Sequence, residues 1–225
     1  MRVGAGVVAA FLVALISVLL LGTVVDQWVR ADGSTGFDHS ITSWALDQRS
    51  SGLTSVMRPV TRLGSATVIA PLTLLVVILL AAKRRFDLAA FVVVGVIGAV
   101  QLSDLAKAIV ERTRPPTRIA LESLQGLSFP SGHSTQATAT YLALAVVVTA
   151  LRRPSALRHA AFVGAIVVAL LVGASRVYLG VHWATDVLGG WFLGTVWIAG
   201  LTTVLYRLHL SAPDLSAAVP EPHRE

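Results

Sequence analysis

Long apolar segments are the feature of this sequence that most constrains its fold. Six of them, each about 15 to 22 residues long, follow one another along the chain. An α-helix rises about 1.5 Å per residue, so about twenty residues cross the roughly 30 Å hydrocarbon core of a bilayer. Charged residues make up only 13% of the chain, well below the share in soluble domains. The sequence therefore predicts an all-α fold, a six-span transmembrane helical bundle. The predicted spans are Gly4–Val25, Leu63–Ala82, Phe86–Ala106, Thr135–Leu151, Ala160–Ala174 and Val187–Tyr206.

A chain of 225 residues has room for one such bundle. We expect a single membrane-embedded domain over residues 1–208, with its core at 37–206. Residues 209–225 are rich in Pro, Ala and charge, which is typical of a disordered tail.

The polar stretch between the first two predicted spans contains two weakly amphipathic patterns. Apolar residues recur at helical spacing from Phe37 to Ala45 and again from Leu53 to Val60. One interpretation is a surface loop with helical turns that covers the bundle end. The other, which we include in the predicted fold, is a pair of short interfacial helices with Trp28 and Trp44 at headgroup depth.

The basic residues give the expected orientation. Lys and Arg divide equally, nine on each side of the predicted membrane. The clusters Lys83-Arg84-Arg85 and Arg152-Arg153 fill very short turns, where the positive-inside rule has most force. Both termini and the tail are therefore predicted to be cytoplasmic. The absence of Cys and the richness in Ala, Val and Arg fit a multi-pass protein of a bacterial inner membrane.

Charge and cysteine content exclude several classes of function. The net charge of +6 could suggest nucleic acid, but most of the basic residues flank apolar segments, where anionic lipid headgroups explain them better. We expect no nucleic-acid partner, and no obligate protein partner is evident. Without cysteine the chain has no disulfide, no thiolate nucleophile and no thiolate metal site.

The first polar motif is Lys107-x6-Arg114-Pro115, at the end of the third predicted span. Basic residues at the end of a span usually extend towards headgroups. Lys107 also has Asp104 and Glu111 at helical spacing, so a surface ion pair is a further alternative.

The second motif is Pro130-Ser131-Gly132-His133-Ser134, directly before the fourth predicted span. Pro and Gly favour a tight loop, and a serine can cap the helix that follows. The free amides and the dipole of that helix start favour an anion. The alternative is an ordinary helix cap whose histidine faces water.

The third motif is Ser175-Arg176-x5-His182-x3-Asp186, before the last predicted span. If the chain is helical from about Val181, His182 and Asp186 share one helix face. A carboxylate beside an imidazole fixes its tautomer and orientation. A surface His–Asp pair is the structural alternative.

Together the three motifs favour chemistry over structure, because the predicted topology places them on one membrane face. Three cations and a helix amino end suit the oxygens of a phosphoryl group. Two imidazoles suit a nucleophile and an acid for its transfer. No His, Asp or Glu cluster has zinc spacing, and no set of carboxylates is suited to paired magnesium ions. We therefore expect metal-free chemistry without a cofactor.

The three motifs resemble the three-part signature of the type 2 phosphatidic acid phosphatases. That family is also called the lipid phosphate phosphatases and is related in fold to vanadium haloperoxidases. All eleven specified positions match, in order. The resemblance extends over residues 37–206, and its motifs lie between Lys107 and Asp186.

The resemblance implies a role for each motif residue. His182 would attack phosphorus and form a phosphohistidine, with Asp186 orienting its ring. His133 would protonate the departing lipid oxygen and then help to activate water. The phosphate oxygens would be held by Lys107, Arg114, Ser131, the Gly132 amide and Arg176.

The resulting hypothesis is a metal-independent phosphatase that acts on a lipid phosphate or diphosphate at the extracytoplasmic face. Undecaprenyl diphosphate, phosphatidic acid and phosphatidylglycerol phosphate are the candidate substrates, and the resemblance slightly favours the polyprenyl diphosphate. A phosphotransferase with the same intermediate is an alternative. A transporter that binds anionic lipids without chemistry is the weaker one.

Further polar and glycine residues near the motifs are interpreted as structural. Arg112, Arg118 and Glu122 flank the motifs. Contact with a lipid headgroup is one interpretation of these residues, but we expect them to be solvated. Gly190 and Gly194 are spaced for close helix packing.

Overall fold

A computed structural model of the chain describes residues 35–123, 125–151 and 153–211, with side chains to 207, and scattered residues between 12 and 26. Every regular element within residues 35–211 is helical, which confirms the all-α prediction. The predicted first span, Gly4–Val25, lies largely outside the described residues, as do residues 212–225. The elements are α2 (Gly36–Asp47), α3 (Ser51–Arg62), α4 (Ala66–Ala82), α5 (Phe86–Val110), the short 3-10 helix η1 (Thr117–Ile119), α6 (Gly132–Ala150), α7 (Ser155–Tyr178) and α8 (Ala184–Ser211).

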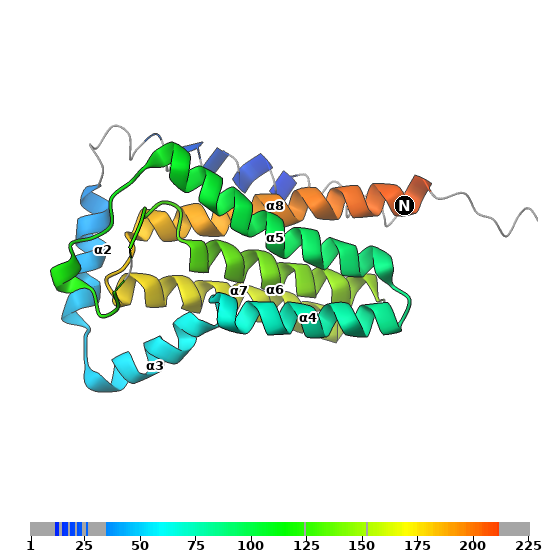
Figure 1. Ribbon diagram of the computed structural model, residues 1–225, viewed down its shortest axis with the longest axis horizontal. Coiled ribbons are helices and arrows are strands. Elements are labelled where there is room, and N and C mark those ends of the chain that lie inside the picture. Colours follow the sequence, from blue (N-terminus) through cyan, green and yellow to red (C-terminus); the bar gives the residue numbers. More distant parts are fainter. Residues whose placement is uncertain are drawn as a thin grey trace, which may run out of the picture.

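Helices α4 to α8 lie side by side and form the bundle (Figure 1). Helix α6 is central, because it contacts α4, α5, α7 and α8. Leu88 and Val92 of α5 are fully buried, and they pack in one apolar cluster with Ala139 and Ala143 of α6 and Ile198 of α8. The apolar residues of these helices thus form a buried core along the bundle.

Two glycines let α8 approach α6 closely. A Cβ at Gly190 would lie 2.8 Å from the Ser131 carbonyl oxygen, and one at Gly194 would lie 2.8 Å from that of Thr135. Such a separation is far below carbon–oxygen contact, so any side chain there would push the helices apart. The predicted close packing at these glycines is confirmed.

The helices confirm part of the predicted membrane topology. Among the described residues, α5, α7 and α8 are long and apolar enough to cross a membrane, and α3 with α4 forms a fourth candidate bent by 43°. A count of six spans is not confirmed. Helix α6 is not among the candidates, and its first half contains the buried polar residues Ser134, Thr135, Thr138 and Thr140. Its place among four other helices explains why it can be less apolar than they are.

The two amphipathic patterns before α4 are both helices. Thr35 and Asp38 form a capping box at the start of α2, and Ser50 caps α3. Helix α2 lies across one end of the bundle (Figure 1). Phe37 and Trp44 are 51% and 61% exposed. Their depth in a bilayer stays a prediction.

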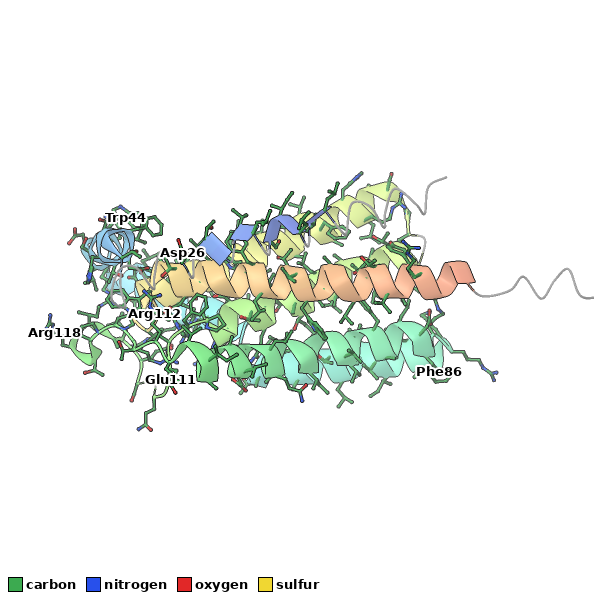
Figure 2. The ribbon with its side chains drawn as sticks, turned by 90° about the horizontal axis from the view of Figure 1, so that it is seen from above. Asp26, Trp44, Phe86, Glu111, Arg112 and Arg118 are labelled. Carbon is green, nitrogen blue, oxygen red and sulfur yellow. The ribbon has the colours of Figure 1, made fainter. Side chains whose placement is uncertain are left out.

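The end of the bundle under α2, which we call the loop end, is where α5 and α7 finish and α6 and α8 begin. Figure 2 shows Trp44, Glu111, Arg112 and Arg118 at this end and Phe86 at the opposite one. Backbone hydrogen bonds join the long 111–131 loop to the turn between α7 and α8 and to the first turn of α8. They run from Leu121 N to Leu179 O at 2.8 Å and from Ser131 N to Asp186 O at 2.9 Å.

Candidate active site

The three sequence motifs meet at the loop end. Lys107 lies in the last turn of α5, Ser131 caps α6, and Arg176 lies in the last turn of α7. His182 lies in the turn that follows, and Asp186 lies in the first turn of α8. The fold therefore brings segments that are almost 80 residues apart in sequence into one cluster.

His182 and Asp186 are in contact, although not in the predicted way. Helix α8 begins at Ala184 rather than near Val181, so His182 precedes the helix. Asp186 accepts a hydrogen bond from the Trp183 amide at 2.8 Å, and His182 Nδ1 lies 3.3 Å from the same carboxylate oxygen. The carboxylate thus caps its own helix start, and this folds the turn back so that the ring reaches it.

The hydrogen bonds of His182 define its tautomer. Arg114 Nη1 lies 3.0 Å from His182 Nε2, and a guanidinium can only donate, so Nε2 accepts and Nδ1 carries the proton towards Asp186. Arg114 is itself anchored by the carbonyl oxygens of Val181 and Gly126, at 2.8 and 3.0 Å. Burial lowers the pKa of His182 to about 4, although the hydrogen bond and the charge of Asp186 oppose this. The ring is therefore neutral at pH 7, with the lone pair on Nε2.

Arg176 is the most distinctive side chain of the cluster. It is 1% exposed, and its Nη1 donates to Thr61 Oγ1 at 2.7 Å and to Glu122 Oε2 at 3.2 Å. Its Nε and Nη2 are buried and have no hydrogen-bond partner among the described residues. Unsatisfied donors of this kind are costly in a folded protein, and an anion would satisfy them. Glu122, predicted to be solvated, instead holds this arginine.

The start of α6 lies against Lys107. A Cβ on Gly132 would lie 3.3 Å from Lys107 Nζ and 3.8 Å from Ser103 Oγ, so glycine leaves room for both beside the first amides of the helix. Those amides have no partner within the helix. Lys107 also lies 3.3 Å from Asp104, whose side chain is 66% exposed, so this ion pair is weak.

His133 and Ser131 both lie at this helix start. Burial, and after it the charges of Arg176, His182, Lys107 and Arg114, lower the pKa of His133 from 6.5 to about 3. The two histidines and the three predicted cations therefore lie in one cluster. Ser131 is fully buried, and its Oγ accepts from the Ser134 amide at 3.4 Å and the Ser134 hydroxyl at 3.0 Å. Its hydroxyl hydrogen is not used in these bonds.

Three residues that contact Asp186 or its partner Arg112 were not predicted from the sequence: Arg112, Asp38 and Ser128. Arg112 was expected to be solvated, but it is 1% exposed and bonds both Asp38 and Asp186. Ser128 also donates to Asp186. No spacing rule joins Asp38 to residues more than seventy positions away, so no signal in one sequence could have found it. Arg118 is exposed, as predicted.

The arrangement can hold an anion between cations and present a neutral imidazole nitrogen to it. Among the described residues, no three histidine or acidic side chains gather as metal ligands. A pocket of about 270 Å³ lies beside Arg114 and Glu122, between the 114–123 loop and Gly180–Val181. The cluster therefore lies next to a pocket formed by the loops.

Comparisons with known proteins show which family the chain belongs to. The PAP2 superfamily model matches residues 88–209. Phosphatidylglycerophosphatase B of Bacillus subtilis is 32% identical over 182 residues, which cover 80% of this chain and 88% of that protein. The undecaprenyl-diphosphatase of Sulfolobus acidocaldarius is 28% identical over 192 residues, or 82% and 87% of the two chains.

Solved structures show the same fold. The crystal structure of a transmembrane PAP2-type phosphatidylglycerolphosphate phosphatase from Bacillus subtilis matches with a TM-score of 0.73 and 28% identity, covering 92% of this chain and 98% of that one. Aquifex aeolicus LpxE matches with a TM-score of 0.60 and 22% identity, over 76% and 97%, and supports the fold alone. The predicted resemblance, and with it the prediction of a lipid phosphate phosphatase, is confirmed. The motifs, the helical bundle and these relatives together establish that the chain belongs to the PAP2 superfamily.

Proposed function

We propose that the protein removes phosphate from a lipid phosphate or diphosphate by way of a phosphohistidine on His182. The observation that carries the proposal is the pairing of two features in one buried cluster. One is the Nε2 lone pair of His182, defined by bonds at both ring nitrogens. The other is Arg176, whose Nε and Nη2 have no partner among the described residues. A phosphoryl group supplies both the electrophile and the acceptor oxygens that these groups require.

The reaction proceeds in two balanced steps. His182 Nε2 attacks phosphorus, the P–O bond to the lipid breaks with its electron pair going to oxygen, and His133 protonates that oxygen. Water then attacks phosphorus with His133 as base, and the P–N bond breaks with its electron pair returning to Nε2. Burial and the surrounding charges lower the pKa of His133 to about 3 in the free protein. Protonation of its ring in the first step therefore depends on the negative charge of the bound phosphoryl group, which raises that pKa.

The cations would hold the phosphoryl oxygens through both steps. Arg176 offers Nε and Nη2, Arg114 offers the N–H that contacts Nε2, and Lys107 lies beside the Gly132 amide. Asp186 keeps the proton of His182 on Nδ1 as the ring becomes charged.

Two lipid classes are the substrates of first choice. Phosphatidylglycerol phosphate and undecaprenyl diphosphate are suggested by the names of the curated relatives, and phosphatidic acid is the simplest monoester to compare with them. All three carry a terminal phosphate on a membrane-anchored tail. The position of the cluster, at one end of a membrane bundle, suits such a lipid.

The test is phosphate release by the solubilised protein from these three lipids, with EDTA present. We expect release that withstands EDTA and disappears in His182→Ala, while His159→Ala, a change to an exposed histidine of α7, leaves it unchanged. Release that survives His182→Ala contradicts the assignment. Equal amounts of free phosphate and dephosphorylated lipid support hydrolysis, whereas a phosphate deficit points to transfer.

The intermediate can be trapped independently. With lipid labelled in its terminal phosphate, a rapid alkaline quench should leave label on the wild type and none on His182→Ala. Label on another residue would overturn the choice of nucleophile.

We also propose that the cluster faces outside the cytoplasm. Lys83, Arg84 and Arg85 directly precede α5 at the opposite end of the bundle, and by the positive-inside rule such a basic cluster lies on the cytoplasmic side. The chain has no cysteine, so single cysteines report cleanly on sidedness. In intact cells an impermeant maleimide should label Arg118→Cys and should not label Lys83→Cys. The reverse pattern would invert the topology.

A further inference from the structure

A second buried arginine, outside the family motifs, lies behind the nucleophile. Arg112 Nη1 donates to Asp186 Oδ1 and to Thr185 Oγ1, both at 2.6 Å. Its Nη2 donates to Asp38 Oδ2 at 2.6 Å. The side chains of Arg112, Asp38 and Asp186 are all fully buried. This arginine therefore bridges two carboxylates, and only one of them belongs to a motif.

Asp38 connects this bridge to α2. It belongs to the capping box of α2 with Thr35, and its Oδ1 accepts from the Thr185 amide at 2.9 Å. Burial alone would raise the pKa of Asp38, but the bonds from Thr185 and Arg112 and the charge of Arg112 lower it below its ordinary value. Asp38 is thus a carboxylate that joins α2 to the start of α8.

The two oxygens of Asp186 have separate partners. Oδ1 accepts from Arg112, while Oδ2 accepts from Ser128 and the Trp183 amide and faces Nδ1 of His182. Fixing Oδ1 therefore fixes the plane of the carboxylate. The 3.3 Å contact with His182 leaves little room for rotation before the hydrogen bond is lost.

We infer that Arg112 is a positioning residue for His182, acting through Asp186, and that Asp38 is its anchor. The inference rests on the proposed function, in which His182 is the nucleophile. Buried ion pairs contribute little to stability relative to apolar packing, so the network's main effect is orientation. Arg112 holds the carboxylate that orients the imidazole, and Asp38 holds Arg112 through its other terminal nitrogen, Nη2.

Three variants test the inference: Arg112→Lys, Arg112→Gln and Asp38→Asn. A lysine is a point charge that cannot bridge both carboxylates in one plane. We expect Arg112→Lys to lower kcat about 10- to 100-fold, the scale of a misplaced catalytic group, with KM within about twofold, because the phosphate-binding cations are untouched. Arg118→Gln, an exposed arginine in the same loop, is the matched control and should keep wild-type kcat.

The pH profile separates positioning from plain loss of folded protein. Asp186, Arg114, Arg176 and His133 face His182 from the surrounding elements, with Arg112 and Asp38 behind Asp186. Arg112→Gln removes a positive charge and should move the acid limb of kcat/KM to higher pH. Asp38→Asn removes a negative charge and should move it to lower pH. A merely structural role would reduce the active fraction and leave both limbs in place.

The double variant Arg112→Gln/Asp38→Asn removes one charge of each sign and provides a folded test if Arg112→Gln does not fold. We expect it to fold and to keep the low kcat, because Asp186 still lacks its anchor. Wild-type kcat in Arg112→Lys or in the double variant, with active wild-type protein alongside, overturns the inference alone. Wild-type protein that releases no phosphate from any lipid contradicts the proposed function instead.

Discussion

Arg112 and Arg176 lie at the same end of the bundle and are equally buried, each 1% exposed, but their surroundings differ. Arg112 donates to two buried carboxylates and a hydroxyl. Arg176 has one threonine and one partly exposed glutamate, and its Nε and Nη2 have no partner among the described residues.

The difference shows how a buried arginine can be classified. Buried polar groups are normally hydrogen-bonded, so a satisfied arginine such as Arg112 belongs to the architecture that orients other groups. An arginine with unused donors bears a desolvation cost that a bound anion would relieve. Arg112 thus contacts Asp186, the carboxylate beside His182, whereas Arg176 keeps unsatisfied donors in the same cluster. Four predictions follow from this contrast, in order of decreasing effect.

The largest effect is expected from Arg176→Gln. Removing a donor that stabilises the transition state costs about 10²- to 10³-fold in rate, and we expect that loss in kcat/KM. Thermal unfolding should not shift to lower temperature, because the variant also removes a buried, incompletely satisfied charge. Arg112→Gln should clearly lower the temperature of thermal unfolding, since breaking a buried ion pair costs about 3–5 kcal/mol.

Both variants can be measured in one detergent by phosphate release and by thermal unfolding. If Arg176→Gln unfolded as easily as Arg112→Gln, the two arginines would both be structural and the contrast would fail.

The second prediction concerns the protonation of the His182 imidazole. In the proposed mechanism the attacking nitrogen of His182 must be unprotonated, and burial lowers the pKa of His182 from 6.5 to about 4. After correction for the ionisation of the substrate and of His133, whose pKa is lowered to about 3, the acid limb set by His182 should lie near pH 4, with kcat/KM falling about tenfold per pH unit below it. An acid limb near 6.5 would show that water reaches the ring. Profiles taken with a lipid monoester between pH 3 and 8 decide between the two.

The third prediction concerns the close contact between α8 and the start of α6. At Gly190 a Cβ would meet Ser131 O and Ser134 Cβ, both at 2.8 Å, whereas at Gly200 it would meet nothing within 4 Å. Gly190→Ala should destabilise the fold by about 1–3 kcal/mol, as overpacking does, and lower kcat several-fold by moving the start of α6. Gly200→Ala in the same helix is the matched control and should retain wild-type stability and activity. Equal behaviour of the two would show that α6 shifts freely.

The sequence alone was sufficient for the parts of the molecule governed by local patterns. Long apolar segments predicted each end of α5 and α7 to within five residues, and the motifs predicted which side chains gather at the loop end. The failures were contacts between distant segments. The Arg112–Asp38 and Arg176–Glu122 pairs join residues 74 and 54 positions apart, and a charged residue in a loop has the same local pattern whether solvent or a carboxylate surrounds it. The start of α8 was misplaced because the Asp186 side chain, rather than helix propensity, determines where that helix begins.

The smallest effect is expected from Glu122→Gln, which tests whether the partner of Arg176 assists or competes. Glu122 is 29% exposed and lies 3.2 Å from Arg176 Nη1, so solvent screens its charge in part. Its charge reduces the positive potential that an incoming phosphate group meets, while Thr61 holds the same Nη1 at 2.7 Å without charge. We therefore expect the inhibition constant of inorganic phosphate to fall about two- to fivefold in Glu122→Gln, with kcat nearly unchanged. A rise in that constant would mean that Glu122 orients Arg176 as Asp38 is inferred to orient Arg112, and the two buried arginines would then differ in their free donors but not in how they are held.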